Sequence, residues 1–191
     1  MESTIGHHTC KDLGNFEEIC ASDGPLAYSE YDEKTKKTPF LGSGYYFWDD
    51  NIEMAHFWGR SRCKNKYYIF EAELNCSEYV LLDLVGNRKH MKWLINAMEM
   101  LKGFNKNNSK WEIGKFIELL KRLSSEDGIY KGMFPFQSIR CVDHYAKIKY
   151  KYYFTEDQTR PDFINLDPRL LICVIEKNEK TIKNFKLVFR T

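Results

Sequence analysis

The sequence predicts a single domain of the α+β class. Strand-like segments lie towards both ends of the chain, whereas residues 87–102 and 110–123 carry apolar side chains at helical spacing. A chain of 191 residues with 43% hydrophobic content can bury one sizeable core. We therefore expect one domain over residues 1–191. It would carry a helical insertion at about 87–124 that could cover a site, bind a partner or complete the core.

The first element is a predicted strand over residues 3–9. Its alternation places His7 and Thr9 on one face and His8 on the other. A helix-like segment follows over residues 10–20. A lone histidine in an edge strand is more often structural or solvated than functional. His7 becomes a candidate because a glycine-rich turn follows at a suitable distance.

That turn contains Gly42 and Gly44, and glycine lets the backbone adopt positive φ and approach a ligand closely. A short strand follows, and one of residues 49–51 can cap the next helix. The strand and the helix can bring Tyr46 to face Phe57, eleven residues later in the sequence. This pair predicts a pocket for a flat aromatic ring, or else two ordinary core aromatics.

These residues resemble one family. His7-His8-Thr9 is similar to the His-x-Ser/Thr motif of the histidine-type ADP-ribosyltransferases, the clade of diphtheria toxin and the poly(ADP-ribose) polymerases. Gly42-Ser43-Gly44-Tyr45-Tyr46-Phe47-Trp48 resembles their Gly-x-Gly-Ile-Tyr-Phe-Ala block, and Phe57 stands where polymerase relatives have tyrosine. The resemblance covers residues 3–85. It implies a split pair of β-sheets with flanking helices.

The resemblance also implies a site for NAD, which this family uses as a substrate. His7 would hydrogen-bond the adenosine ribose, and the backbone at His8 would pair with the nicotinamide carboxamide. Relatives usually have glycine at that second position, so the His8 side chain would have to point away. Tyr46 and Phe57 would sandwich the nicotinamide ring. The implied NAD-binding residues are His7, His8, Thr9, Gly44, Tyr46 and Phe57.

A carboxylate should complete this site, because loss of nicotinamide builds positive charge on the ribose. In the family a glutamate lies at the start of a late strand. Here the apolar run 170–175 predicts that strand, and no glutamate opens it. We assign the role to Asp167, so the predicted catalytic residues are His7, Tyr46 and Asp167. The alternative carboxylates are Glu156, Asp162 and Glu176.

Further strands are predicted over residues 66–74, 79–84, 138–142 and 145–154. The last has a basic face beside aromatic residues. This pattern is typical of a surface that holds single-stranded nucleic acid, and also of a solvated strand. The basic residues are Lys147, Lys149 and Lys151.

Composition limits the class of protein. A formal net charge of +2 excludes a broadly polybasic surface, so any nucleic-acid contact must be local. The six cysteines form no CxxC pair, which predicts thiols in a reducing cytoplasm and disfavours zinc near Cys10. No secretory signal and no run of about 20 apolar residues is present, so we expect a cytoplasmic protein without a membrane partner.

Together these observations predict an NAD-dependent mono-ADP-ribosyltransferase that modifies a macromolecular acceptor, either protein or RNA. Such an enzyme resembles an intracellular bacterial toxin or anti-phage effector, which would need a neutralising antitoxin partner. Two alternatives stay open. One is a non-catalytic module that binds NAD or ADP-ribose, and the other is a nucleic-acid-binding protein.

Overall fold

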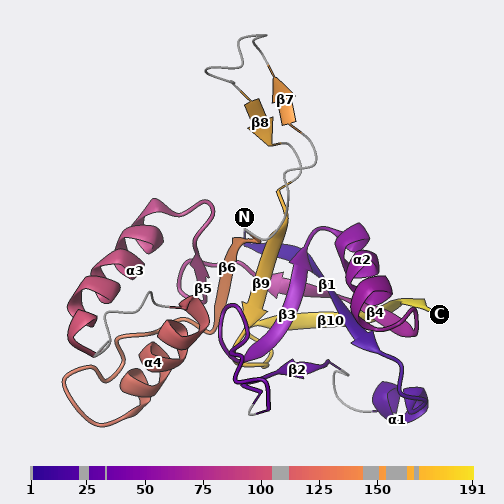
Figure 1. Cartoon of the computed structure of the whole chain (residues 1–191), viewed down its shortest axis with the longest axis horizontal. Coiled ribbons are helices and arrows are strands. Elements are labelled where there is room, and N and C mark those ends of the chain that lie inside the picture. The colour runs from indigo at the N-terminus through magenta and orange to yellow at the C-terminus, as the bar shows by residue number, and fades with distance from the viewer. Residues whose placement is uncertain are drawn as a thin grey trace.

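The computed structural model describes residues 2–21, 26–32, 34–104, 112–143, 151–153, 163–165 and 168–191. It shows an α+β fold (Figure 1), which confirms the predicted class. The strands of the main sheet are β1 (Ser3–Lys11), β2 (Tyr28–Ser29), β3 (Gly44–Asp49), β4 (Tyr67–Asn75), β5 (Leu81–Asp83), β6 (Ser138–Val142), β9 (Leu170–Val174) and β10 (Ile182–Arg190). The helices are α1 (Phe16–Ala21), α2 (Ile52–Arg62), α3 (Arg88–Met100), the 3-10 turn η1 (Lys102–Phe104) and α4 (Ile113–Ser125).

Eight of the described strands form one sheet in the order β10-β4-β1-β3-β9-β6-β5, with β2 added to β3. Its pairs are antiparallel apart from the parallel pair of β5 with β6. Strands β7 (Lys151–Tyr153) and β8 (Phe163–Asn165) pair with each other in a second, two-stranded sheet. The α+β class is thus established, while the finer ADP-ribosyltransferase arrangement stays a prediction.

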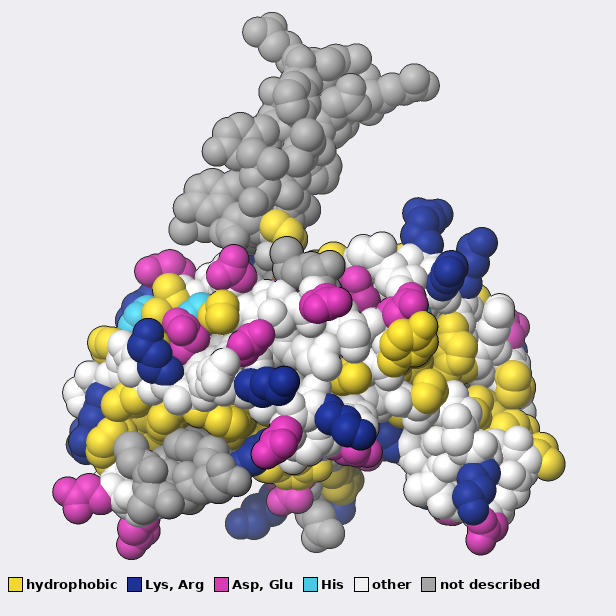
Figure 2. All heavy atoms as spheres, turned by 180° about the vertical axis from the view of Figure 1, so that it is seen from behind, with side chains coloured by type: hydrophobic (Ala, Val, Ile, Leu, Met, Phe, Trp, Pro, Cys, Tyr) yellow, Lys and Arg dark blue, Asp and Glu magenta, His cyan; other side chains and the backbone are white. Residues whose placement is uncertain are grey.

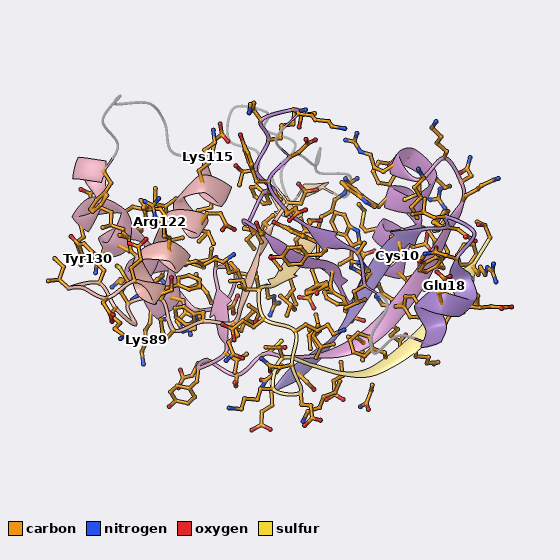
Figure 3. The ribbon with its side chains drawn as sticks, turned by 90° about the horizontal axis from the view of Figure 1, so that it is seen from below. Cys10, Glu18, Lys89, Lys115, Arg122 and Tyr130 are labelled. Carbon is orange, nitrogen blue, oxygen red and sulfur yellow. The ribbon has the colours of Figure 1, made fainter. Side chains whose placement is uncertain are left out.

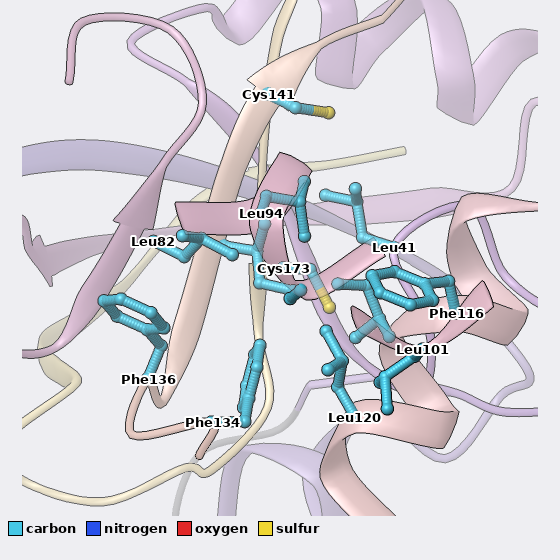
Figure 4. Packing of buried hydrophobic residues seen from close by; sticks show 13 residues of the cluster. Leu41, Leu82, Leu94, Leu101, Phe116, Leu120, Phe134, Phe136, Cys141 and Cys173 are labelled. Carbon is cyan, nitrogen blue, oxygen red and sulfur yellow. The ribbon is translucent and has the colours of Figure 1, made fainter. Parts of the chain in front are cut away.

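Helices α2, α3 and α4 cover one face of the main sheet, which we call the helix-covered face. The largest core cluster lies there, between α3, α4 and strands β5, β6 and β9 (Figure 4). Helices α3 and α4 therefore form part of the core, which is one of the three roles expected for this helical segment. Its fully buried side chains include Leu101, Phe116, Ile117 and Leu120.

The opposite face of the sheet is curved. Leu81 of β5 and Ile182 of β10 belong to strands at the two ends of the sheet, yet both pack into one cluster around Phe47. The sheet must therefore curl around this cluster. Antiparallel sheets twist in this way because of the backbone chirality of their strands.

Local signals placed most elements correctly. The Asn51 side chain caps α2 by accepting a hydrogen bond from Met54 N–H at 3.0 Å. The helix expected over residues 10–20 was wrong at its start, because Lys11 still pairs with Tyr67 in β4 and α1 begins only at Phe16. Among the described helices, none has the length and apolar content to cross a membrane.

Helix α4 lies against the segment that leads into β3. A Cβ at Gly114, in its first turn, would overlap the carbonyl oxygen of Pro39. Glycine here thus permits a close approach of helix and loop, although it is a poorer helix former than alanine by about 1 kcal/mol.

We expect Gly114→Ala to destabilise the protein by about 2 kcal/mol, because the added methyl group forces the helix away from the loop. Urea unfolding measures this change. Gly103→Ala is the matched control, since a Cβ there would meet no atom within 4 Å. It should be neutral or slightly stabilising. A Gly114→Ala protein more stable than the parent would contradict the close packing.

Candidate functional site

The sheet opens between β1 and β3. These strands pair only at Gly6 with Asp49 and at His7 with Trp48, after which they separate. The far edge of β3 is taken by β9, so β2, which pairs with β3 at Tyr45, must lie on the side of the opening. We call the space between β1 and β3 beyond His7 the split.

Strand alternation decides which backbone groups face the split. Asp50 N–H donates to Ile5 C=O at 2.7 Å, so the odd-numbered residues of β1 direct N–H and C=O towards β3. The even-numbered residues point towards β4, as the bond from Asp12 N–H to Lys66 C=O shows. The next odd residue after His7 is Thr9. Its backbone faces the split and has no backbone partner on that side within the described chain.

The His8 side chain bridges the split. It lies on the face opposite to His7, as predicted, and is buried against Phe47. Its Nε2 accepts a hydrogen bond from Ala27 N–H at 2.9 Å, and its Nδ1 lies 2.7 Å from Tyr46 C=O. A neutral imidazole has one donor and one acceptor nitrogen, so Nδ1 carries the proton and donates it to Tyr46. Burial lowers the pKa of His8 to about 4, so the ring is neutral at pH 7.

His7 lies on the helix-covered face, with 6% of its surface exposed. Its Nε2 is 3.6 Å from Oε2 of Glu71, the residue directly opposite on β4. Its Nδ1 is buried and has no hydrogen-bond partner within the described chain. Burial lowers the pKa of His7, and the nearby charges of Glu71 and Asp50 only partly oppose this effect. His7 is therefore a neutral imidazole with one unused ring nitrogen.

Tyr46 holds the glycine-rich turn. Its hydroxyl donates to Gly42 C=O at 2.6 Å and accepts from Leu41 N–H at 2.7 Å, while burial raises the pKa of the phenol. Gly42 has a φ of +83°, which favours glycine. At Gly44 a Cβ would lie 2.5 Å from Cys173 Sγ, so this glycine lets β3 approach β9.

Helix α4 clamps the same turn from outside. Glu118 accepts a hydrogen bond from Ser43 N–H at 2.5 Å. Lys121 donates to Ser43 C=O at 3.3 Å and to Glu118 at 2.9 Å. The sequence analysis missed both side chains. Their only signal was a polar pair three residues apart on an amphipathic helix, which does not reveal what the pair contacts.

Helix α2 forms the other wall of the site. Thr9 Oγ1 donates to Ala55 C=O at 2.8 Å, which fixes α2 over β1. Phe57 is 46% exposed, and the Arg169 guanidinium lies 5.4 Å from its ring centre. Phe57 and Tyr46 make no ring contact with each other in the described structure. Neither ring therefore uses the other as its packing partner.

The structure describes only some of the carboxylates that are candidates for the catalytic acid. Asp167 lies outside the described residues, as do Glu156 and Asp162. Glu176 follows the far end of β9, about 20 Å along the strand from Leu170. Glu71 is the carboxylate beside His7, and the sequence analysis missed it. Its signal was an acidic residue inside the apolar strand β4.

The remaining sequence candidates are the basic residues of segment 145–154 and the cysteine that follows the first histidines. Lys147 and Lys149 lie outside the described residues. For Lys151 the structure describes the strand β7 but not the side chain. Burial raises the pKa of Cys10 to about 12. No group of three or more His, Cys, Asp or Glu residues in the described part could hold a metal ion.

Comparison with known proteins found no matching family model, no matching curated protein and no matching solved structure.

The buried neutral His8 should make stability depend on pH. Its pKa lies below the ordinary value of 6.5, so the unfolded chain binds the proton first as pH falls. Stability is thus retained above about pH 6.5 and lost towards pH 4. The loss due to His8 should be about 2 kcal/mol between pH 7 and pH 5.

Urea unfolding of the parent and of His8→Gln at these two pH values measures the effect. Glutamine can donate to Tyr46 and accept from Ala27 but cannot titrate. The variant should keep only the smaller pH dependence contributed by groups such as His7. An equally steep loss in both proteins would show that His8 is not the group that titrates.

Proposed function

We propose that this protein is an NAD-dependent mono-ADP-ribosyltransferase that modifies a macromolecular acceptor, either protein or RNA. The observation that carries the proposal is the split in the sheet. Strand β1, with His7 and Thr9, and strand β3, with Tyr46, separate at the point where the sequence motifs resemble the family's site. Phe57 follows on α2, over the same face.

The residues around the split fit a dinucleotide with a flat amide ring. The Thr9 backbone, rather than that of His8, offers an N–H and a C=O in the plane of the sheet, which suits a carboxamide. In this proposal the Nδ1 of His7, which is buried and has no partner within the described chain, accepts from a ribose hydroxyl once NAD displaces the groups that cover it. Tyr46 and Phe57 offer aromatic faces on which nicotinamide could stack.

In this proposal the bond between ribose C1 and the nicotinamide nitrogen breaks, and nicotinamide leaves with the bonding electron pair. The acceptor then attacks C1 and loses its proton. Positive charge on the ribose must be stabilised by a carboxylate. Asp167 remains the proposed residue, and Glu71 is the described alternative because it already faces His7.

A second candidate is a module that binds NAD or ADP-ribose without catalysis. One specific observation favours it. Strand β9 begins with Leu170-Leu171 and is preceded by Arg169, so its start presents a cation and apolar side chains. Incubation of the purified protein with NAD, with free nicotinamide as the readout, separates the two functions. Release supports transfer, whereas NAD binding without release supports the module.

A toxin or anti-phage role, with a neutralising antitoxin, is the cellular setting that we propose for the transferase. Induced expression should then arrest growth of a host cell, and an inactive variant should not. An arrest that persists in a variant unable to release nicotinamide would reject this setting.

We expect Phe57→Ala to lower nicotinamide release about fivefold, since a stacking contact contributes about 1 kcal/mol. Stability should change little because the ring is half exposed. Phe57→Tyr keeps the aromatic face and should keep most activity. Tyr79→Ala, at a side chain that is 81% exposed, is the matched control and should behave as the parent. Full activity in Phe57→Ala would remove this residue from the site.

We expect Asp167→Asn to lower the rate of nicotinamide release about 10²- to 10³-fold with little change in NAD affinity, because the charge it stabilises exists only in the transition state. Calorimetric titration with NAD measures the affinity. Glu71→Gln, Glu156→Gln, Asp162→Asn and Glu176→Gln are the parallel variants. If Glu71→Gln abolishes release while Asp167→Asn does not, the acid belongs to β4.

A further inference from the structure

A basic surface surrounds an exposed tryptophan at the C-terminal end of α2. We call it the Trp58 surface. Four cations occur between Trp58 and Lys66 without any acidic residue. Lys11 joins them, because it pairs with Tyr67 at the end of β1, and Asp12 N–H bonds to Lys66 C=O. The cations are Lys11, Arg60, Arg62, Lys64 and Lys66, and all are exposed.

The positive charge of this surface is not compensated. None of its five cations forms an ion pair within the described chain. Asp12 lies nearby but faces Arg190, at 3.5 Å. The acidic turn of α1 belongs to the other face of the sheet, where Phe16 packs against Tyr68. On much of the face seen in Figure 2, basic and acidic side chains are intermingled, and a separate group of basic side chains stands at its upper right.

Trp58 adds an aromatic platform to this charge. The indole is 43% exposed and rests against Trp48, with ring centres 6.4 Å apart. The Arg62 guanidinium lies 5.4 Å from the indole centre. An exposed ring of this kind can stack on a nucleobase, and the arginine can contact a neighbouring phosphate.

We infer that the Trp58 surface binds single-stranded nucleic acid, with phosphates on the cations and a base on the indole. Uncompensated cations recognise any polyanion, whereas a stacking ring selects chains whose bases are unpaired. Phe57 precedes Trp58 in α2, so the bound strand would lie beside the proposed NAD site. Its use as the acceptor rests on the proposed transferase function, but the binding itself does not.

Fluorescence anisotropy of a labelled oligouridine of about 20 nucleotides, without NAD, tests the inference. The full chain should bind, and its affinity should fall with salt. Replacing Arg60, Arg62 and Lys64 together by glutamine should weaken binding at least tenfold and reduce the salt slope by about 2. Trp58→Ala should weaken binding about tenfold, whereas Trp58→Phe should retain most of it.

A matched control removes the same charge elsewhere. Arg88, Lys89 and Lys92 are exposed on α3, and Lys89 lies at the end of the molecule away from Cys10 (Figure 3). The nearest indole there, Trp93, is engaged with Phe134 and Phe136. Changing these three cations to glutamine should leave affinity almost unchanged.

Three outcomes would overturn the inference. They are no binding by the parent protein at about 50 mM salt, equal losses in the two triple variants, and equal binding of duplex DNA with no effect of Trp58→Ala. Thermal melting checks the fold of each variant. If Trp58→Ala unfolds, the two triple glutamine variants and Trp58→Phe still test whether the Trp58 surface binds the strand. Their substituted side chains are exposed, so these variants should keep the fold. Binding with no nicotinamide release would reject the transferase and keep this surface.

Discussion

The buried imidazole of His8 supplies hydrogen bonds to two backbone groups, Tyr46 C=O and Ala27 N–H, where the sheet opens. The strands β1 and β3 are held at their closed end by two residue pairs and by the hydrogen bond from Thr4 to Asp49, at 2.7 Å. If the two strands stayed paired beyond this closed end, Thr9 would lie opposite Tyr46. His8 donates to the Tyr46 carbonyl instead. A buried carbonyl without a partner costs about 1–3 kcal/mol. The hydrogen bond from His8 avoids this cost at Tyr46 and so stabilises the separated strands.

Both walls of the site depend on segments far away in sequence. On one side, α4 holds the glycine-rich turn through a hydrogen bond that spans 75 positions, from Ser43 to Glu118. On the other side, the carbonyl of Ala55 receives the Thr9 hydroxyl and fixes α2. Helix α4, which forms part of the core, thus also holds the turn to which Tyr46 is bonded. A change in core packing that moves α4 would therefore also move the glycine-rich turn and Tyr46.

Charge is distributed unevenly over a chain that is almost neutral as a whole. Near His7 the charged neighbours include the carboxylates of Glu71 and Asp50, and burial lowers the pKa of the imidazole. Near the end of α2, five exposed cations form no ion pair within the part of the chain that the structure describes. A dinucleotide in the split and a polyanionic acceptor on the Trp58 surface would therefore meet different environments. The split supplies shape and hydrogen bonds, whereas the Trp58 surface supplies long-range electrostatic attraction.

The sequence by itself determined the elements and motifs that depend on neighbouring residues. Alternation placed His7 and His8 on opposite faces, the cap at Asn51 started α2, and helical spacing located α3 and α4. Only the tertiary structure decided that Thr9 faces the split, that Glu71 lies beside His7 and that β1 continues where a helix was expected. These features arise from strand register and helix docking. Pairing of distant segments is set by the burial of the whole core, and no local window of the sequence contains it.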